Sequence, residues 1–149
     1  MHRSVLGFVI LTALAGAPVL ANAQDTPSLS EPQLLRSADD ALNTGDTDGA
    51  VQLYQSAIIY SPGDPVPYLK LAELYMRGSQ TELARQYFAL ALDVQPAYAP
   101  ALQGLALLDL AAGDRAGAMA QHEVLLRACG ATCPETAQVE KALNTSTAR

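Results

Sequence analysis

Basic side chains, tryptophan and cysteine are all scarce in this chain of 149 residues. Nine Lys and Arg stand against 15 Asp and Glu, and the net charge is −6 at pH 7. No cluster of basic residues is present that could follow a phosphate backbone, which argues against nucleic-acid binding. The acidic balance also disfavours contact with anionic lipid surfaces. We therefore expect no nucleic-acid partner.

Groups that commonly carry catalysis or bind metals are also scarce. The chain has two histidines, and His122 is the one that lies beyond the N-terminal segment. A hydrolase triad or a histidine-based metal centre would depend on it. No glycine-rich loop follows an expected strand, which leaves nucleotide binding unsupported. We therefore expect no cofactor, no metal and no enzymatic activity.

The N-terminal segment has the pattern of a signal peptide. A short basic start precedes the apolar run Val5–Ala15, which is too short to span a bilayer, and small residues end at Ala23. We expect residues 1–23 to be cleaved after Ala23 and residues 24–30 to form a linker. The mature chain would then be periplasmic or secreted, without a membrane span. An uncleaved membrane anchor is the alternative.

The rest of the chain repeats every 34 residues, over 31–64, 65–98 and 99–132. Alanine at fixed offsets lets two helix backbones cross closely, and proline follows the second helix in the first two copies, where the third has glycine. Such a period is typical of stacked helical hairpins. The recurring registers are a first alanine (Ala38, Ala72, Ala106), a second alanine (Ala50, Ala84, Ala118), an aromatic position (Tyr54, Phe88, His122), a further small position (Ala57, Ala91, Leu125) and a closing turn (Pro62, Pro96, Gly130).

The repeated residues resemble the tetratricopeptide repeat. The middle copy carries the whole pattern, namely Tyr68, Leu71, Ala72, Tyr75, Ala84, Phe88, Ala91 and Pro96. The outer copies depart from it, the first at Ser37 and Ala41, the third at Asp109, His122, Leu125 and Gly130. Weaker terminal copies are expected, because they face solvent on one side. The resemblance is to an exported bacterial type with a C-terminal cysteine pair.

We therefore predict an all-α solenoid of three helix-turn-helix units and a C-terminal capping helix within residues 133–149. Gly45-Asp46 and Gly113-Asp114 are predicted to end one helix and cap the next, where the middle unit has Gly78-Ser79-Gln80. His122 is predicted to be a packing residue. The expected helices are Pro32–Asn43, Thr47–Tyr60, Pro65–Arg77, Thr81–Val94, Ala99–Ala112, Arg115–Ala128 and, as the cap, Pro134–Asn144.

One face of each first helix is a candidate binding surface. Residues at i, i+4 and i+7 share a helix face, and the family resemblance implies that this face lines a concave groove. Such a groove would be mostly apolar with acidic points, which suits a peptide with aliphatic anchors and a basic residue. The residues, called the groove set below, are Leu35, Asp39, Leu42, Leu69, Glu73, Met76, Arg77, Gln103, Leu107 and Leu110.

Other interpretations of the groove set stay open. Its leucines could be core residues, and its acids could be solvated charges without a ligand. A second copy, or the chain's own N-terminal segment, could fill the groove and make the protein a self-associating one. The carboxylate clamp of chaperone-binding members is disfavoured, because Leu35 and Asp39 occupy its positions in the first unit and an acid would repel the ligand.

Cys129 and Cys133 enclose three residues between the third unit and the expected cap. In an exported protein such a pair predicts a structural disulfide, which would fix the angle of the cap and stabilise the fold by roughly 2 kcal/mol. A redox-active pair is the alternative. A metal site is disfavoured, because two thiolates leave half a tetrahedral shell empty.

These patterns together predict an exported, non-catalytic adaptor or scaffold. It would bind a protein or peptide partner in the groove, within a periplasmic envelope assembly. A self-associating structural protein and a thiol–disulfide protein acting through Cys129 and Cys133 are the two alternatives.

Overall fold

The computed structural model describes residues 29–146; the predicted signal peptide and most of the predicted linker lie outside this range. Predicted and observed helix ends agree to within two residues, and the prediction of an all-α solenoid is confirmed. Within the described range there is no strand, and the helices are α1 (Glu31–Asn43), α2 (Thr47–Tyr60), α3 (Val66–Arg77), α4 (Thr81–Val94), α5 (Ala99–Ala111), α6 (Arg115–Cys129) and α7 (Pro134–Ser146).

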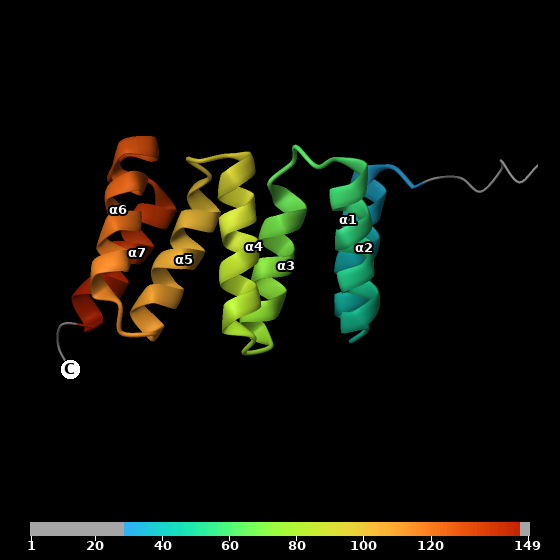
Figure 1. Cartoon of the computed structure of the whole chain (residues 1–149), viewed down its shortest axis with the longest axis horizontal. Helices are drawn as coiled ribbons and strands as arrows, with labels where there is room; N and C mark the ends of the chain where they lie inside the picture. The colour runs from blue at the N-terminus through green and yellow to red at the C-terminus, as the bar shows by residue number, and fades with distance from the viewer. Residues whose placement is uncertain (1–28, 147–149) are drawn as a thin grey trace, which may run out of the picture.

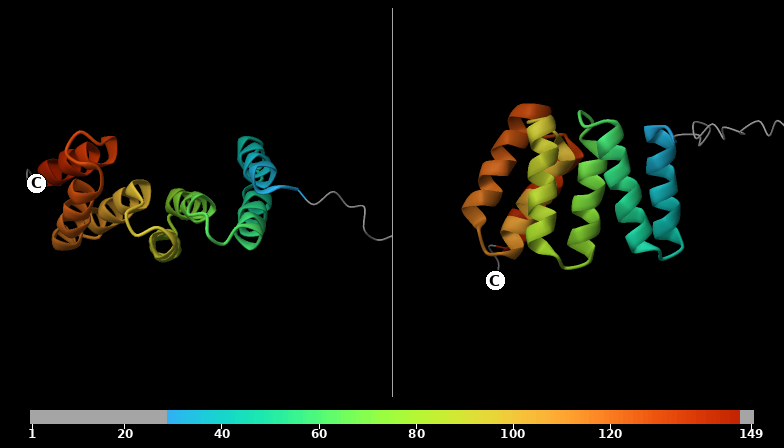
Figure 2. Two further views of the ribbon diagram at one scale, coloured as in Figure 1. Left: turned by 90° about the horizontal axis from the view of Figure 1, so that it is seen from above. Right: turned by 45° about the vertical axis from the view of Figure 1, so that its right-hand side comes forward.

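The helices stand side by side in chain order, from α1 and α2 at one end to α6 and α7 at the other (Figure 1). The two helices of each unit pair as a hairpin, and α2 packs on α3 as α4 packs on α5. Contacts therefore run mainly between neighbours in sequence, as in other solenoids. At the C-terminal end α7 packs against both α5 and α6 (Figure 2).

The two alanine registers lie where the helices of each hairpin cross. All six alanines have 0% of their surface exposed. The first and second alanine of a unit belong to the same core cluster, in all three units. A larger side chain at either position would force the two helices apart.

The aromatic register fills space between units. Tyr54 and Phe88 are both fully buried. The Phe88 ring lies so close to Gly104 of α5 that any Cβ at that glycine would overlap it. The glycine therefore lets α5 approach α4 closely.

The turns inside the hairpins follow the predicted chemistry in the outer units. Gly45 and Gly113 have positive φ angles of 85° and 81°. Asp46 and Asp114 each accept a hydrogen bond, at 2.9 Å, from a backbone N–H in the first turn of the next helix. In the middle unit Ser79 has the positive φ, 58°, and Gln80 makes no such capping bond.

None of the helices between residues 29 and 146 is both long enough and apolar enough to cross a bilayer.

Candidate functional site

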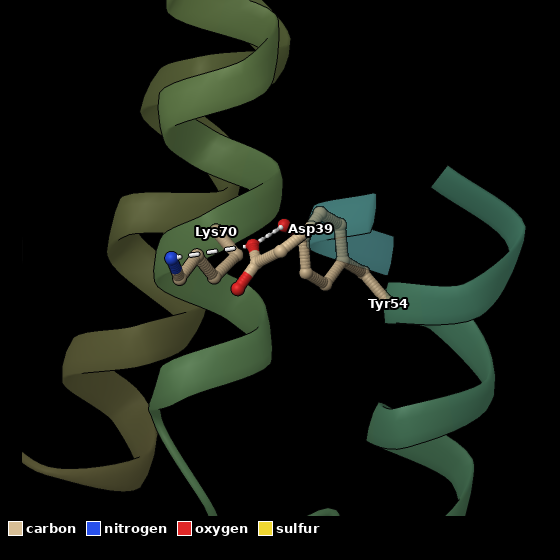
Figure 3. Close-up of polar contacts among 3 residues, drawn as sticks. All are labelled: Asp39, Tyr54 and Lys70. Atoms are coloured by element: carbon tan, nitrogen blue, oxygen red, sulfur yellow. Dashed lines mark hydrogen bonds and ion pairs between the residues drawn. The ribbon is translucent and has the colours of Figure 1, made fainter. Parts of the chain in front are cut away.

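Asp39 of the groove set is engaged by two neighbours (Figure 3). Tyr54 of α2 donates a hydrogen bond from its hydroxyl to Asp39 Oδ1 at 2.6 Å. Lys70 of α3 reaches the same oxygen at 3.5 Å. The Asp39 side chain is about half exposed, so the pairing does not remove it from solvent. Asp39 therefore joins the first unit to the second as well as facing solvent.

Tyr54 is held in its neutral form. Its burial in the core raises the pKa of the hydroxyl well above the usual value, and the hydrogen bond to Asp39 raises it further. The ring has no exposed surface. Tyr54 therefore stays a hydrogen-bond donor to Asp39 across the neutral pH range.

The groove residues of α3 differ in accessibility. Leu69 is 8% exposed and belongs to the core cluster that also holds Phe88 and Leu105, so it offers little surface to a ligand. Glu73 and Met76 are half-buried, and Arg77 is exposed. Within residues 29–146 neither Glu73 nor Arg77 makes an ion pair. Their charges are therefore free to meet a ligand.

One of the groove residues of α1 lines a small hollow. Leu35 and Leu42 are half-buried and pack against the core of the first unit. Leu42 also lines a pocket of about 440 Å³ that reaches across to Arg77 and Leu74 of α3. The structure thus brings groove residues of the first and second units together at this end of the hairpins.

A second pocket, of about 660 Å³, lies between α5 and α7. Leu107 and Leu110 of the groove set form its floor on α5. Beside it, the side-chain amide of Gln103 donates a hydrogen bond to Gln138 of α7 at 2.7 Å. The α7 wall presents both apolar and polar groups, namely Gln138, Lys141, Ala142, Thr145 and Ser146. The capping helix is therefore also one wall of a pocket.

Two cations near the groove set lie outside it. Lys70 pairs with Asp39, and Lys141 lines the α5–α7 pocket without an ion pair inside residues 29–146. Spacing along one helix could not identify either of them, because their places depend on how one unit stacks on the next. The i, i+4, i+7 rule tests only residues that share a helix.

Asp109, which stands where the repeat pattern has an aromatic residue, forms an ion pair with the neighbouring unit. Asp109 is buried, and its carboxylate pairs with Arg85 of α4. The pair stands at the junction of the second and third units, where an aromatic ring was expected. A buried carboxylate at this place is acceptable because it has a cation as a partner.

Cys129 and Cys133 have their sulfur atoms at disulfide distance, with Cα atoms 5.6 Å apart. Glu135 lies near the same two sulfurs, and these three residues are the group within the described range that could hold a metal ion. Two bonded sulfurs cannot act as thiolate ligands. In this form the pair links α6 to α7.

His122 is half-buried and lines a hollow between α6 and α7. Its Nε2 is buried and has no hydrogen-bond partner among the described residues. His122 thus differs from Tyr54 and Phe88 of the same register, which a following unit covers completely.

Residues 41–90 match the family model of the tetratricopeptide repeat. The "Tetratricopeptide repeat and J domain-containing co-chaperone DNJ1" of Fusarium oxysporum f. sp. lycopersici is 31% identical to the chain over 124 residues. That alignment covers 82% of this chain and 24% of the relative. The chain therefore spans about a quarter of the length of the curated relative it matches.

Solved structures share the architecture. The first tetratricopeptide domain of Spaghetti (RPAP3), bound to an HSP90 peptide, has a TM-score of 0.68 at 19% identity, covering 80% of this chain and 97% of that one. The Yersinia enterocolitica type III secretion chaperone SycD, in complex with a peptide of the translocator YopD, has a TM-score of 0.68 at 18% identity, covering 78% and 92%. The fold is a tetratricopeptide-type α-solenoid, and the family match supports a tetratricopeptide-repeat protein.

Proposed function

We propose that the chain is an exported, non-catalytic tetratricopeptide-repeat adaptor that binds a segment of a partner protein along the groove set, within a periplasmic envelope assembly. The observation that carries the proposal is the pocket between α5 and α7, because Leu107 and Leu110 of the groove set line it. An apolar pocket with a few polar groups is the usual form of a recognition site.

The chemistry of the two halves of the groove defines the partner segment. The α5–α7 pocket accepts an aliphatic or aromatic anchor, since its floor is leucine and its wall contains Ala142. Glu73 of α3 offers a negative charge to a basic residue of the same segment. Leu69 is not part of this surface, because it is buried.

The similar structures support a peptide-binding role without naming this chain's partner. One of them was solved with an HSP90 peptide and another with a YopD peptide. A carboxylate clamp stays disfavoured, because Asp39 stands where the clamp needs a cation or an amide. The activity of the co-chaperone DNJ1 is not extended to this chain, which matches a quarter of it.

Export is the part of the proposal that rests on sequence. The apolar run Val5–Ala15 and the small residues before Gln24 lie outside the described residues. They support a periplasmic or secreted protein with a mature N-terminus at Gln24.

Crosslinking in the source cells, followed by mass spectrometry, tests the proposal. The wild type is compared with a Met76→Glu, Leu107→Glu variant, whose positions are half-buried on α3 and α5. We expect one partner to be captured by the wild type and lost from the variant, because a charge at each half-buried position opposes the burial of apolar anchors. In the same experiment, the N-terminal peptide of the protein itself is expected to begin at Gln24.

The matched control is Ile59→Glu, Tyr60→Glu, which places two charges on exposed residues of α2 outside the groove set. Circular dichroism and thermal melting establish that all the chains are folded. A partner captured equally by all three proteins would place binding elsewhere and overturn the groove proposal. Crosslinks between copies of the protein, with no other partner, would favour the self-associating alternative.

A further inference from the structure

The capping helix α7 stands in the place of the first helix of a fourth unit. Like α3 and α5, it packs on the second helix of the preceding unit. If the 34-residue period is continued into α7, Glu140 takes the position of Ala106 and Leu143 takes the position of Asp109. Among the described residues no helix follows α7 to complete the unit.

At each junction the second helix of one unit and the first helix of the next contribute a pair of residues that are 24 positions apart in the sequence. At the first junction Val51 and Tyr75 both pack against one core cluster. At the second junction Arg85 pairs with Asp109. The corresponding pair at the third junction is Met119 of α6 and Leu143 of α7, and both line one hollow of about 640 Å³.

The first two pairs are covered by the second helix of the next unit. Tyr87 of α4 stacks on Tyr75, with ring centroids 5.3 Å apart. Gly117 of α6 lies close to Asp109. In the third pair Leu143 is buried, whereas Met119 has no such cover within residues 29–146 and is 53% exposed. We call this hollow the end slot; it is bounded by Met119, His122 and Leu126 of α6 and by Glu140 and Leu143 of α7.

The shape of the end slot fits a helix, because α4 and α6 lie over the equivalent pairs at the two inner junctions. Its surface is apolar at Met119 and at the exposed Leu126. The slot therefore suits an amphipathic helix.

The charge at the slot specifies what that helix carries. In the three complete units the first alanine is buried against the second alanine of the covering helix. Glu140 takes the place of this alanine, is exposed, and makes no ion pair in the described range. Arg115, which also lines the slot, donates its hydrogen bonds to Leu143 O and Ser146 Oγ. A covering helix with a basic residue at its crossing point would therefore complement Glu140.

We propose that the end slot docks an amphipathic helix of a partner protein, packed on α6 and α7 with a basic residue opposite Glu140. A second copy of this chain is a poorer occupant, because the chain carries 15 acidic and nine basic residues and its copies repel one another. The slot is separate from the groove: none of its bounding residues belongs to the groove set.

A probe can be made from α4, the second helix of the middle unit. It is a fluorescein-labelled peptide copying Thr81–Val94 with Ala84→Lys, because Ala84 is the second alanine of its unit. With Gln86→Lys, a lactam bridge between the side chains at positions 82 and 86, both exposed in α4, keeps the isolated peptide helical. The parent peptide, with Ala84 retained, is the comparison. Fluorescence anisotropy measures both affinities for the full protein.

We expect the Ala84→Lys peptide to bind about fivefold more tightly than the parent, as one added ion pair contributes. Glu140→Lys is expected to reverse this preference, and an Ala84→Glu peptide is expected to restore binding to that variant. Met119→Asp is expected to weaken all three peptides, because it places a charge in the apolar part of the slot. Ile59→Asp, at an exposed position of α2, is the matched control and is expected to change nothing.

The groove variant Met76→Glu, Leu107→Glu separates this proposal from the proposed function. It is expected to bind the Ala84→Lys peptide as the wild type does. Loss of the peptide from that variant, or equal binding of both peptides to all proteins, overturns the end-slot proposal. Sedimentation that shows a dimer dissociated by Met119→Asp would assign the slot to a second copy and also overturn it.

Discussion

At the junction of the second and third units one carboxylate depends on one cation. The Asp109 side chain is 6% exposed and that of Arg85 36%. Removing the cation leaves a buried charge without a partner, which is far costlier than losing an exposed pair. We predict that Arg85→Ala lowers the free energy of unfolding by about 3 kcal/mol, measured by urea denaturation.

The control for this prediction is the exposed pair between Arg127 and Glu123 on α6. Arg127→Ala should lower the free energy of unfolding by less than about 0.5 kcal/mol, because solvent screens both charges. Similar small losses in both variants would mean that the buried Asp109 carboxylate does not depend on Arg85 for its stabilisation.

Sequence reasoning reached Asp109 but not its partner. The register marked Asp109 as a departure from an aromatic position, while Arg85 could be assigned to it only once the units were stacked. The same limit applies to Leu69 and Met76. They share a helix face by spacing, yet Leu69 is core and Met76 is half-buried. Burial of a face depends on the angle at which the neighbouring unit packs, which no spacing along one helix contains.

Among the elements, the turn between α3 and α4 is chemically the weakest of the three hairpin turns. Ser79 occupies the left-handed conformation that glycine takes in the other units, and Gln80 supplies no cap. We predict that Ser79→Gly with Gln80→Asp raises the free energy of unfolding by about 1–2 kcal/mol, since strain is relieved and a capping bond is added. Thermal and urea unfolding would measure the gain.

The reverse change is available in the first unit. Gly45→Ser with Asp46→Gln should lower stability by a similar amount, because it creates the middle unit's turn there. No gain from the middle-unit change, alongside a clear loss in the first unit, would show that Ser79 and Gln80 have contacts of their own that offset the strain.

Helix boundaries were predictable because three copies of one pattern each marked the same ends. The α5–α7 pocket was not predictable in the same way. One of its walls belongs to α7, which was expected as a cap outside the three copies, so its side chains were not matched with Leu107. The signal peptide and the linker stay predictions, because they lie almost wholly outside residues 29–146.

For the whole molecule, contact mainly between neighbouring units means that a local change has a local effect. The Cys129–Cys133 link joins α6 to α7, at one end of the solenoid. We predict that Cys129→Ser with Cys133→Ser costs about 2 kcal/mol, because the short loop is no longer closed in the unfolded chain. Hydrogen exchange should quicken in α7 and stay unchanged in α1 and α2.

Urea unfolding with and without a reductant provides the check. The wild type should lose stability when reduced, and the double serine variant should not respond. Exchange that quickened equally in every helix would mean that the solenoid unfolds as one cooperative block, against the nearest-neighbour description.

The shared oxygen of Asp39 has a consequence for the ionic-strength dependence of binding. Lys70 already occupies Asp39 Oδ1 beside the Tyr54 hydroxyl. A cationic group of a ligand that takes the place of Lys70 at Oδ1 adds no ion pair to the total. Salt screens the pair that is lost and the pair that is gained alike, so at this oxygen the two effects cancel. A dependence of groove affinity on salt therefore reports on Glu73, Arg77 and Lys141, whose charges are unpaired within the described residues.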